Sequence, residues 1–145
     1  MVVSPSLSPR MPMPRDETLS LRSSEDVVQV RQAVRAAAVD LRFSLVDQTK
    51  IVTAASELGR NTLDYGGGGT VRLQVLQDGG RRGIRLTFED KGPGITDIER
   101  ALKDGYTTGG GLGLGLGGAR RLSSEFSIDS RPGEGTRVTI ARWTA

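Results

Sequence analysis

The sequence predicts an α+β fold, a two-layer sandwich in which helices cover one face of a mostly antiparallel, mixed sheet. Two observations carry this prediction. Two pairs of segments with alternating apolar and polar residues are each joined by a glycine-containing turn, and two longer segments repeat apolar residues at helical spacing. The expected order is one strand, two helices, two strands, a glycine-rich crossover with a helix, and two strands.

The first expected elements are a short edge strand at 18–22 and a helix that begins after it. Ser23 is followed three residues later by Asp26, the capping-box spacing that starts a helix. The apolar stripe of this helix is Val27, Val30, Val34, Ala37 and Leu41.

A second helix is expected from about 45 to 65, because Ser44 and Asp47 repeat the same spacing. Its apolar stripe is Ile51, Ala54, Ala55 and Leu58. Glu57 and Asn61 are four residues apart and therefore share an adjacent face of this helix. The run GGGG at 66–69 ends it.

A β-hairpin is expected from the alternating segments 71–75 and 84–90. The inward row of its second strand is Ile84, Leu86 and Phe88, and period two puts Asp90 next in that row. The Asp90 carboxylate is therefore expected on the face of the strand that faces the core. An unpaired buried carboxylate is costly, so Asp90 needs a hydrogen-bond donor from the protein or from a ligand.

The remaining expected elements follow a turn at 92–94. They are a short helix at 96–105, a helical segment at 119–124, and a closing hairpin of 125–130 with 136–143.

Length and composition fit one domain. The chain has 145 residues, of which 36% are hydrophobic, and these numbers suit a single core. Residues 1–16 hold four prolines and little apolar periodicity. We therefore expect a flexible tail at 1–16 and a domain at 17–145.

Composition also excludes several kinds of chemistry. The chain has no cysteine and no histidine, which excludes disulfides, zinc sites built from these residues, and histidine or thiol catalysis. Without a signal-peptide core or a run of transmembrane length, a cytoplasmic protein with no membrane partner is expected. The net charge of +3 suits an anionic ligand, but the basic residues are scattered and aromatics are only 4%, so nucleic acid is not an expected partner.

The stretch YTTGGGLGLGLGGARR (106–121) has too many glycines for an ordinary helix or strand. A linker between domains does not fit, because only 24 residues follow Arg121. A Walker A loop lacks its lysine, and the G-x-G-x-x-G match at Gly113, Gly115 and Gly118 is weak alone. Bare backbone N–H groups ahead of a helix can still approach phosphate oxygens, which predicts a phosphate lid.

Three stretches together resemble the boxes of the GHKL ATPase superfamily. ELGRN (57–61) is similar to its N box, EDKGPGI (89–95) to its D-x-G-x-G box, and GGGLGLGL (109–116) to its lid box. The amino-acid sequence of these stretches looks most like that of RsbT-type serine/threonine kinases of bacterial anti-sigma regulation. The resemblance extends from about residue 18 to residue 143. This resemblance implies the Bergerat ATP-binding fold, with ATP and Mg²⁺ as cofactors.

By the resemblance, Glu57 is the general base, and Asn61 is a nucleotide-site residue that binds Mg²⁺. The residue types agree, since a carboxylate and an amide on one helix face supply a proton acceptor and a hard oxygen ligand. Taken without the other boxes, an ion pair of Glu57 with Arg60 or Arg120 and a surface amide at Asn61 would explain the same residues.

The resemblance also makes Asp90 the acceptor for the adenine amino group, which would account for its inward direction. Asp90 could equally cap the turn at Gly92, and the two roles can coexist. Gly92 and Gly94 would let the backbone pass close to the base, beside Ile95 of the same box. Thr136 matches a threonine next to adenine, although it also suits an ordinary strand.

The lid and the cations complete the expected site. The lid residues expected at the nucleotide are Thr108, Gly109, Gly111, Leu112, Gly113, Leu114, Gly115 and Leu116. Asp64 departs from the family, where a basic residue is common, and the turn at 66–69 is looser than usual. Phosphate charge would then be met by Mg²⁺ and by one of four cations that the sequence does not separate: Arg60, Lys91, Arg120 and Arg121.

The implied activity is phosphoryl transfer from Mg·ATP to a serine or threonine of a STAS-domain antagonist protein, with a downstream phosphatase or sigma-regulatory protein as a further partner. One alternative is an RsbW-type anti-sigma factor kinase that binds a sigma factor. The residues of the first and third boxes, which are more like those of the RsbT type, disfavour this alternative. The other is a non-catalytic interaction module switched by nucleotide, which the intact Glu57 disfavours.

Overall fold

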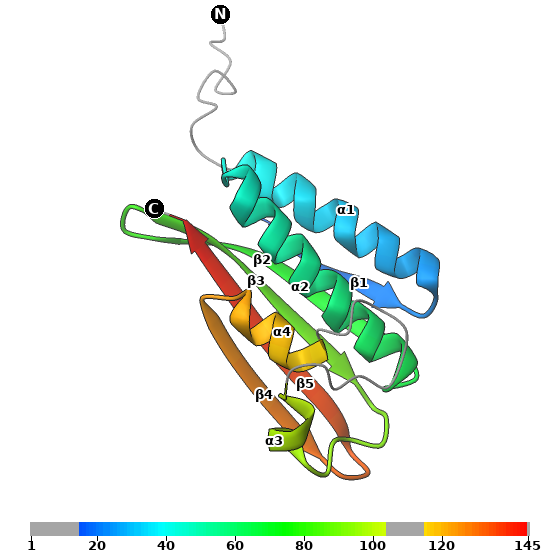
Figure 1. Ribbon diagram of the computed structural model, residues 1–145. Helices are drawn as coiled ribbons and strands as arrows, with labels where there is room; N and C mark the ends of the chain where they lie inside the picture. Colours follow the sequence, from blue (N-terminus) through cyan, green and yellow to red (C-terminus); the bar gives the residue numbers. More distant parts are fainter. Residues whose placement is uncertain (1–14, 104–114, 145) are drawn as a thin grey trace, which may run out of the picture.

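The computed structural model describes residues 15–103 and 115–144, and these form a five-stranded sheet with helices on one face (Figure 1). The strands are β1 (Asp16–Leu21), β2 (Gly69–Asp78), β3 (Arg81–Asp90), β4 (Glu125–Arg131) and β5 (Gly135–Thr144). The helices are α1 (Ser24–Asp40), α2 (Leu45–Asp64), α3 (Ile98–Ala101) and α4 (Gly115–Arg121). The predicted α+β class and its element order are confirmed.

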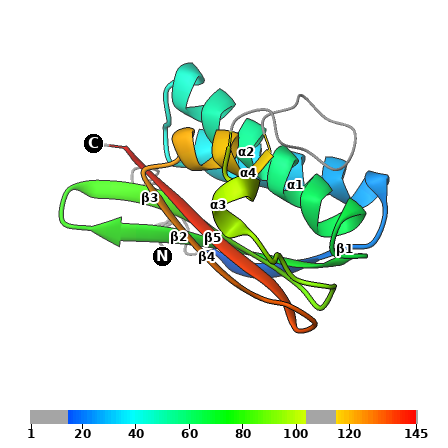
Figure 2. The same cartoon turned by 60° about the horizontal axis from the view of Figure 1, so that its bottom comes forward.

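The sheet has the order β1-β2-β3-β5-β4, and each of its described pairings is antiparallel. The expected mixed character is therefore wrong for the described strands. The crossover through α3 and α4 does give β3 and β4 the same direction, but β5 lies between them and runs opposite to both. Figure 2 shows the helices gathered on one side of the sheet.

The two long helices begin where the sequence predicts. Ser23 Oγ accepts the Asp26 N–H at 3.2 Å, and Ser44 Oγ accepts the Asp47 N–H at 3.1 Å. Each bond satisfies one of the N–H groups that a helix start leaves unpaired. The Asp26 carboxylate reaches back to the N–H of Arg22 at 2.8 Å, one residue before the position that a capping box uses.

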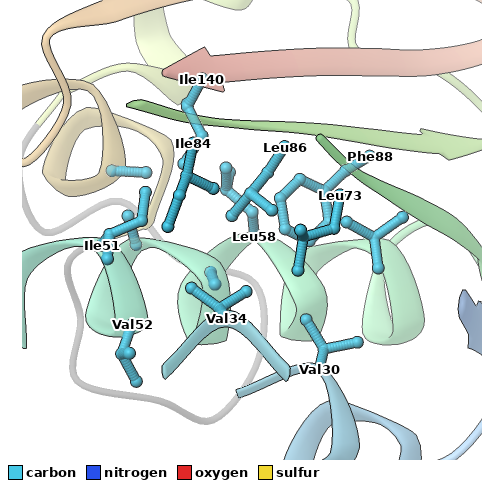
Figure 3. Close-up of a cluster of buried hydrophobic side chains, with 14 of the residues drawn as sticks. Val30, Val34, Ile51, Val52, Leu58, Leu73, Ile84, Leu86, Phe88 and Ile140 are labelled. Carbon is cyan, nitrogen blue, oxygen red and sulfur yellow. The ribbon is translucent and has the colours of Figure 1, made fainter. Parts of the chain in front are cut away.

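The core lies between the inward rows of the strands and the stripes of α1 and α2 (Figure 3). Ile84 and Leu86 of β3 are fully buried, and Phe88 is 2% exposed. Figure 3 shows these side chains directed toward Ile51 and Leu58 of α2. The predicted inward row is confirmed, and it leads along β3 toward Asp90.

The segment after β3 differs most from the expected elements. α3 is a single turn over Ile98–Ala101, started by the Asp97 side chain, rather than a helix over 96–105. α4 begins at Gly115, four residues before the helical segment expected at 119–124. Its glycines 115, 117 and 118 are buried, and α4 packs on α2.

At the N-terminus, β1 begins at Asp16, one residue before the expected domain start, and the Arg15 carbonyl accepts the Val75 N–H at 2.9 Å. The expected tail otherwise lies outside the described residues. None of the helices over residues 15–103 and 115–144 is long and apolar enough to span a bilayer.

Candidate active site

A cavity of about 300 Å³ lies between α2, the end of β3 and the start of β5, with α3 and the start of α4 along its rim. Its apolar lining residues are Leu58, Phe88, Ile95, Ala101, Leu116 and Val138. Three of the expected polar site residues, Asn61, Asp90 and Thr136, also line it. A hollow that combines apolar walls with converging polar groups is typical of small-molecule sites, and this volume is at the lower end of their range.

Glu57 and Asn61 lie one turn apart on α2, as their spacing predicts. Asn61 lines the cavity, whereas Glu57 lies one turn toward the start of α2, beside the first residue of α4. Glu57 is only 8% exposed, and its Oε1 accepts the Gly115 N–H at 3.4 Å. That bond is at the long end of the range for an N–H···O hydrogen bond.

Asp90 ends the inward row of β3 and faces the cavity. Its Oδ1 accepts the Gly92 N–H at 2.9 Å, so the predicted cap of the turn is present. Burial raises the pKa of Asp90, partly offset by backbone N–H bonds from Gly92 and Thr136. Its position at the cavity leaves room for a second role with a ligand donor.

The four-glycine turn at 66–69 has a packing reason that the sequence did not reveal. A Cβ on Gly66 would overlap the Asp90 carboxyl group, and a Cβ on Gly69 would overlap the Glu89 carbonyl. The end of α2 therefore closes against the end of β3 with bare backbone. This close approach keeps Asp90 under the last turn of α2.

The glycines of the second box also pack against protein backbone. A Cβ on Gly92 would lie 2.7 Å from the Gly66 carbonyl oxygen. Gly94 has φ +76°, and a Cβ there would overlap the Arg131 carbonyl. These contacts account for Gly92 and Gly94 within the protein, and the expected approach to a base stays a prediction.

Ser130 joins three parts of the site and was missed from the sequence. Its Oγ accepts the Ile95 N–H at 2.7 Å, shares a 2.7 Å hydrogen bond with Thr136 Oγ1, and bonds the Gly135 carbonyl at 3.2 Å. Ser130 and Thr136 are partners across the β4–β5 hairpin. The turn 131–135 between them was the one signal in the sequence that could have predicted this pairing.

The four candidate cations do not gather at the cavity. Arg60 lies 3.9 Å from Asp64 one turn along α2, and Lys91 lines a different hollow, of about 620 Å³, at the same end of the sheet. Arg120 and Arg121 are in the last, exposed turn of α4. The basic residue that lines the cavity is Arg100 of α3, which was not among the four candidate cations.

Other lining residues were also missed: Thr62, Tyr65, Thr96 and Asp97. Of the expected lid residues, six lie outside the described residues: Thr108, Gly109, Gly111, Leu112, Gly113 and Leu114. Gly115 and Leu116 are described, and Leu116 is buried against the cavity. The structure thus brings together five of the expected residues around one hollow: Asn61, Asp90, Ile95, Leu116 and Thr136.

Comparisons with known proteins agree with this geometry. Residues 46–144 match the family described as histidine kinase-, DNA gyrase B-, and HSP90-like ATPase. The chain is 46% identical over 118 residues to the serine/threonine-protein kinase RsbT of Bacillus subtilis strain 168, which covers 81% of this chain and 89% of that one. It is 28% identical over 129 residues to an anti-sigma F factor of Thermoanaerobacter sp. strain X514, with 85% and 89% covered.

Solved structures share the fold. One contains the RsbU and RsbW domains of a Mycobacterium tuberculosis protein, with a TM-score of 0.61 and 23% identity; the match covers 90% of this chain and 32% of that chain. The SiaB–SiaC complex of Pseudomonas aeruginosa has a TM-score of 0.50 at 14% identity, with 96% and 95% covered. Likeness at these identities concerns the arrangement of helices and strands.

Proposed function

This chain belongs to the histidine kinase-, DNA gyrase B- and HSP90-like ATPase family and is an ATP-dependent serine/threonine protein kinase of the RsbT kind, and we propose that its substrate is a STAS-domain antagonist protein. The observation that carries the site assignment is the grouping of Glu57, Asn61 and Asp90 at and beside one cavity. This reaction needs a proton acceptor, an oxygen ligand for the metal ion, and a hydrogen-bond acceptor for the adenine base.

Glu57 is the general base and accepts the proton of the substrate hydroxyl as that oxygen attacks phosphorus. Two features support this role: the carboxylate is buried, and its bond from the Gly115 N–H is long at 3.4 Å. A buried carboxylate that is weakly bonded can take a proton from a hydroxyl held beside it.

The cavity binds the adenine end of ATP. Its apolar walls suit the faces of a flat ring, and the Asp90 carboxylate accepts the adenine amino group. Asn61 is the metal-binding residue, and its amide oxygen gives Mg²⁺ one protein ligand. Mg²⁺ often takes only one or two protein ligands, with water and substrate phosphate oxygens as the others.

Bound Mg·ATP supplies the phosphoryl group that is transferred. The remaining expected nucleotide contacts stay part of this proposal: Gly92, Gly94, Ile95 and Thr136 at the base, and Gly115 and Leu116 at the start of α4. Ile95, Leu116 and Thr136 are supported by their positions in the cavity lining. Arg100 joins them as a cation at the rim.

The proposal also includes a role in a partner-switching pathway, in which the kinase exchanges one protein partner for another. In that role the protein acts in the cytoplasm and has a downstream phosphatase or sigma-regulatory protein as a further partner. Curated relatives named as a serine/threonine kinase and as anti-sigma factors support this role. In this role, phosphorylation of the antagonist would release the kinase for its next partner.

The test uses the purified full chain, Mg²⁺ and ATP labelled on its γ-phosphate, with STAS-domain proteins from the same genome as candidate substrates. We expect label on one serine or threonine of a STAS-domain protein, located by mass analysis of its peptides. Direct capture of a sigma factor by the chain would instead favour the RsbW-type alternative. Nucleotide binding with no transfer to any candidate would favour the non-catalytic module.

A further inference from the structure

Arg142 of β5 bonds two elements of the helix layer at once. Its Nη2 and Nε donate to Asp47 Oδ1 at 2.6 and 3.1 Å, and its Nη1 donates to the Leu122 carbonyl at 2.9 Å. Asp47 is in the first turn of α2, and Leu122 directly follows α4. One guanidinium therefore joins β5, the start of α2 and the end of α4.

This ion pair is better shielded from solvent than the other ion pairs among the described residues. The Arg142 and Asp47 side chains are 15% and 24% exposed, whereas the bidentate pair of Arg72 and Asp16 on the open face of the sheet is 52% exposed at both partners. Hydrogen bonding from Arg142 lowers the pKa of Asp47. Shielded charge-assisted bonds hold their geometry better than exposed ones.

The segment after α4 is attached to β5 by two further bonds. The Ser124 N–H donates to the Ala141 carbonyl at 2.8 Å, and the Trp143 N–H donates to Ser124 Oγ at 3.1 Å. The last carbonyl groups of a helix lack partners within it, and Arg142 satisfies that of Leu122 with a positive charge. The C-terminal end of α4 is thus fixed in place.

The opposite end of α4 meets the proposed general base. The Gly115 N–H contacts Glu57, and α4 lies along α2 (Figure 1). Asp47 and Glu57 are ten positions apart on α2, about 15 Å, and Leu122 lies seven positions after Gly115, about 10 Å at the helical rise. Arg142 therefore fixes how far along α2 the helix α4 sits, and so where Gly115 meets Glu57.

We propose that Arg142 is a positioning residue for phosphoryl transfer, which acts through α4 on the contact between Gly115 and Glu57. The inference rests on the proposed role of Glu57. Small displacements of reacting groups cost large factors in rate, on the order of a hundredfold for 1 Å. Asp90, which carries the expected contact with the adenine amino group, is on β3, whereas Leu116 of α4 supplies one part of the cavity lining, so displacement of α4 should affect ATP affinity only slightly.

The first variant is Arg142→Gln, with Arg142→Lys as the conservative replacement and Asp47→Asn as a change at the partner. Arg72→Gln is the matched control, because it also removes a two-bond pair with an aspartate, but that pair joins β2 to β1 rather than to α2 or α4. If Arg142→Gln does not fold, Arg142→Lys and Asp47→Asn carry the test. Activity is measured well below the unfolding temperature of each variant.

We expect kcat of Arg142→Gln to fall roughly tenfold or more, with the KM for ATP within about twofold of wild type. Arg142→Lys should recover part of this loss, and Arg72→Gln should keep the wild-type kcat. The amide NMR signal of Gly115 should move in Arg142→Gln toward its position in Glu57→Gln, where the carboxylate acceptor is gone.

The proposal is overturned if Arg142→Gln is less stable but keeps the Gly115 signal and a kcat equal to that of Arg72→Gln, since Arg142 would then support the fold alone. The Gly115 signal needs no protein substrate. Failure of the wild type to phosphorylate any STAS-domain protein would therefore reject the proposed function, while the amide signal would still decide the positioning role of Arg142.

Discussion

Asp90 stands opposite Thr136 in the ladder between β3 and β5, and both side chains face the cavity beneath α2. In their rows, buried Phe88 precedes Asp90 and buried Val138 follows Thr136. The row of apolar side chains forms a floor, and the two polar groups define its edge. A flat ring with polar atoms on one side fits such a surface.

Asp90→Asn should weaken ADP binding by roughly ten- to a hundredfold, because a hydrogen bond to a charged acceptor is worth about 1.5–3 kcal/mol. The amide oxygen can still accept the Gly92 N–H, so the fold should survive. Calorimetric titration with ADP measures the change, with Asp129→Asn on exposed β4 as the control. Equal affinities of wild type and Asp90→Asn would remove Asp90 from the nucleotide site.

Nucleotide affinity should also fall on acidification. Burial raises the pKa of Asp90 above 3.8, so its carboxylate is protonated at a higher pH than an ordinary aspartate and becomes a weaker acceptor. The free energy of unfolding changes in the opposite direction. Because the pKa of Asp90 is raised in the folded state, this group adds stability as the pH falls through that pKa. ADP titrations between pH 7 and about 4.5 test this, and parallel curves for wild type and Asp90→Asn would contradict it.

Gly66→Ala should destabilise the protein by about 1–3 kcal/mol and weaken nucleotide binding, because the added methyl group overlaps the Asp90 side chain. Gly80→Ala is the matched control, since a Cβ there meets nothing within 4 Å. Urea unfolding measures both, and the control should stay within about 0.5 kcal/mol of wild type. An equally stable Gly66→Ala protein with full affinity would show that the turn can move away from Asp90.

Ser130→Ala removes the hydroxyl that bonds the Ile95 N–H and Thr136 Oγ1. We expect a loss of about 1–2 kcal/mol in unfolding free energy and a several-fold weaker affinity for ADP, because the loop at Ile95 forms part of the cavity wall. Ser127→Ala, at an exposed position of the same strand, should change neither. The idea fails if the two serine variants behave alike.

The features predicted correctly from sequence depend on local chemistry. Serine caps fixed the starts of both long helices, and period two predicted that Asp90 would follow Phe88 into the interior. The α2 pair of Glu57 and Asn61 followed from helical spacing alone. These inferences needed no knowledge of distant residues.

The features that were missed depend on distant packing. α4 includes three glycines and packs on α2, and the helix penalty of glycine hides such a helix in the sequence. Ser130, Arg100 and Arg142 become informative only when strands and helices far apart in the chain are brought together. Sequence spacing also did not show that Arg60, Lys91, Arg120 and Arg121 lie outside the cavity lining, and their contact with phosphate stays a prediction.

The most direct test of the account compares wild type with Glu57→Gln for nucleotide affinity and for phosphoryl transfer to a STAS-domain protein. The account predicts that Glu57→Gln binds Mg·ATP with nearly unchanged affinity but transfers phosphate at least about a hundredfold more slowly, the usual effect of removing a general base. Transfer by Glu57→Gln at the wild-type rate would contradict the central claim that this buried carboxylate accepts the substrate proton.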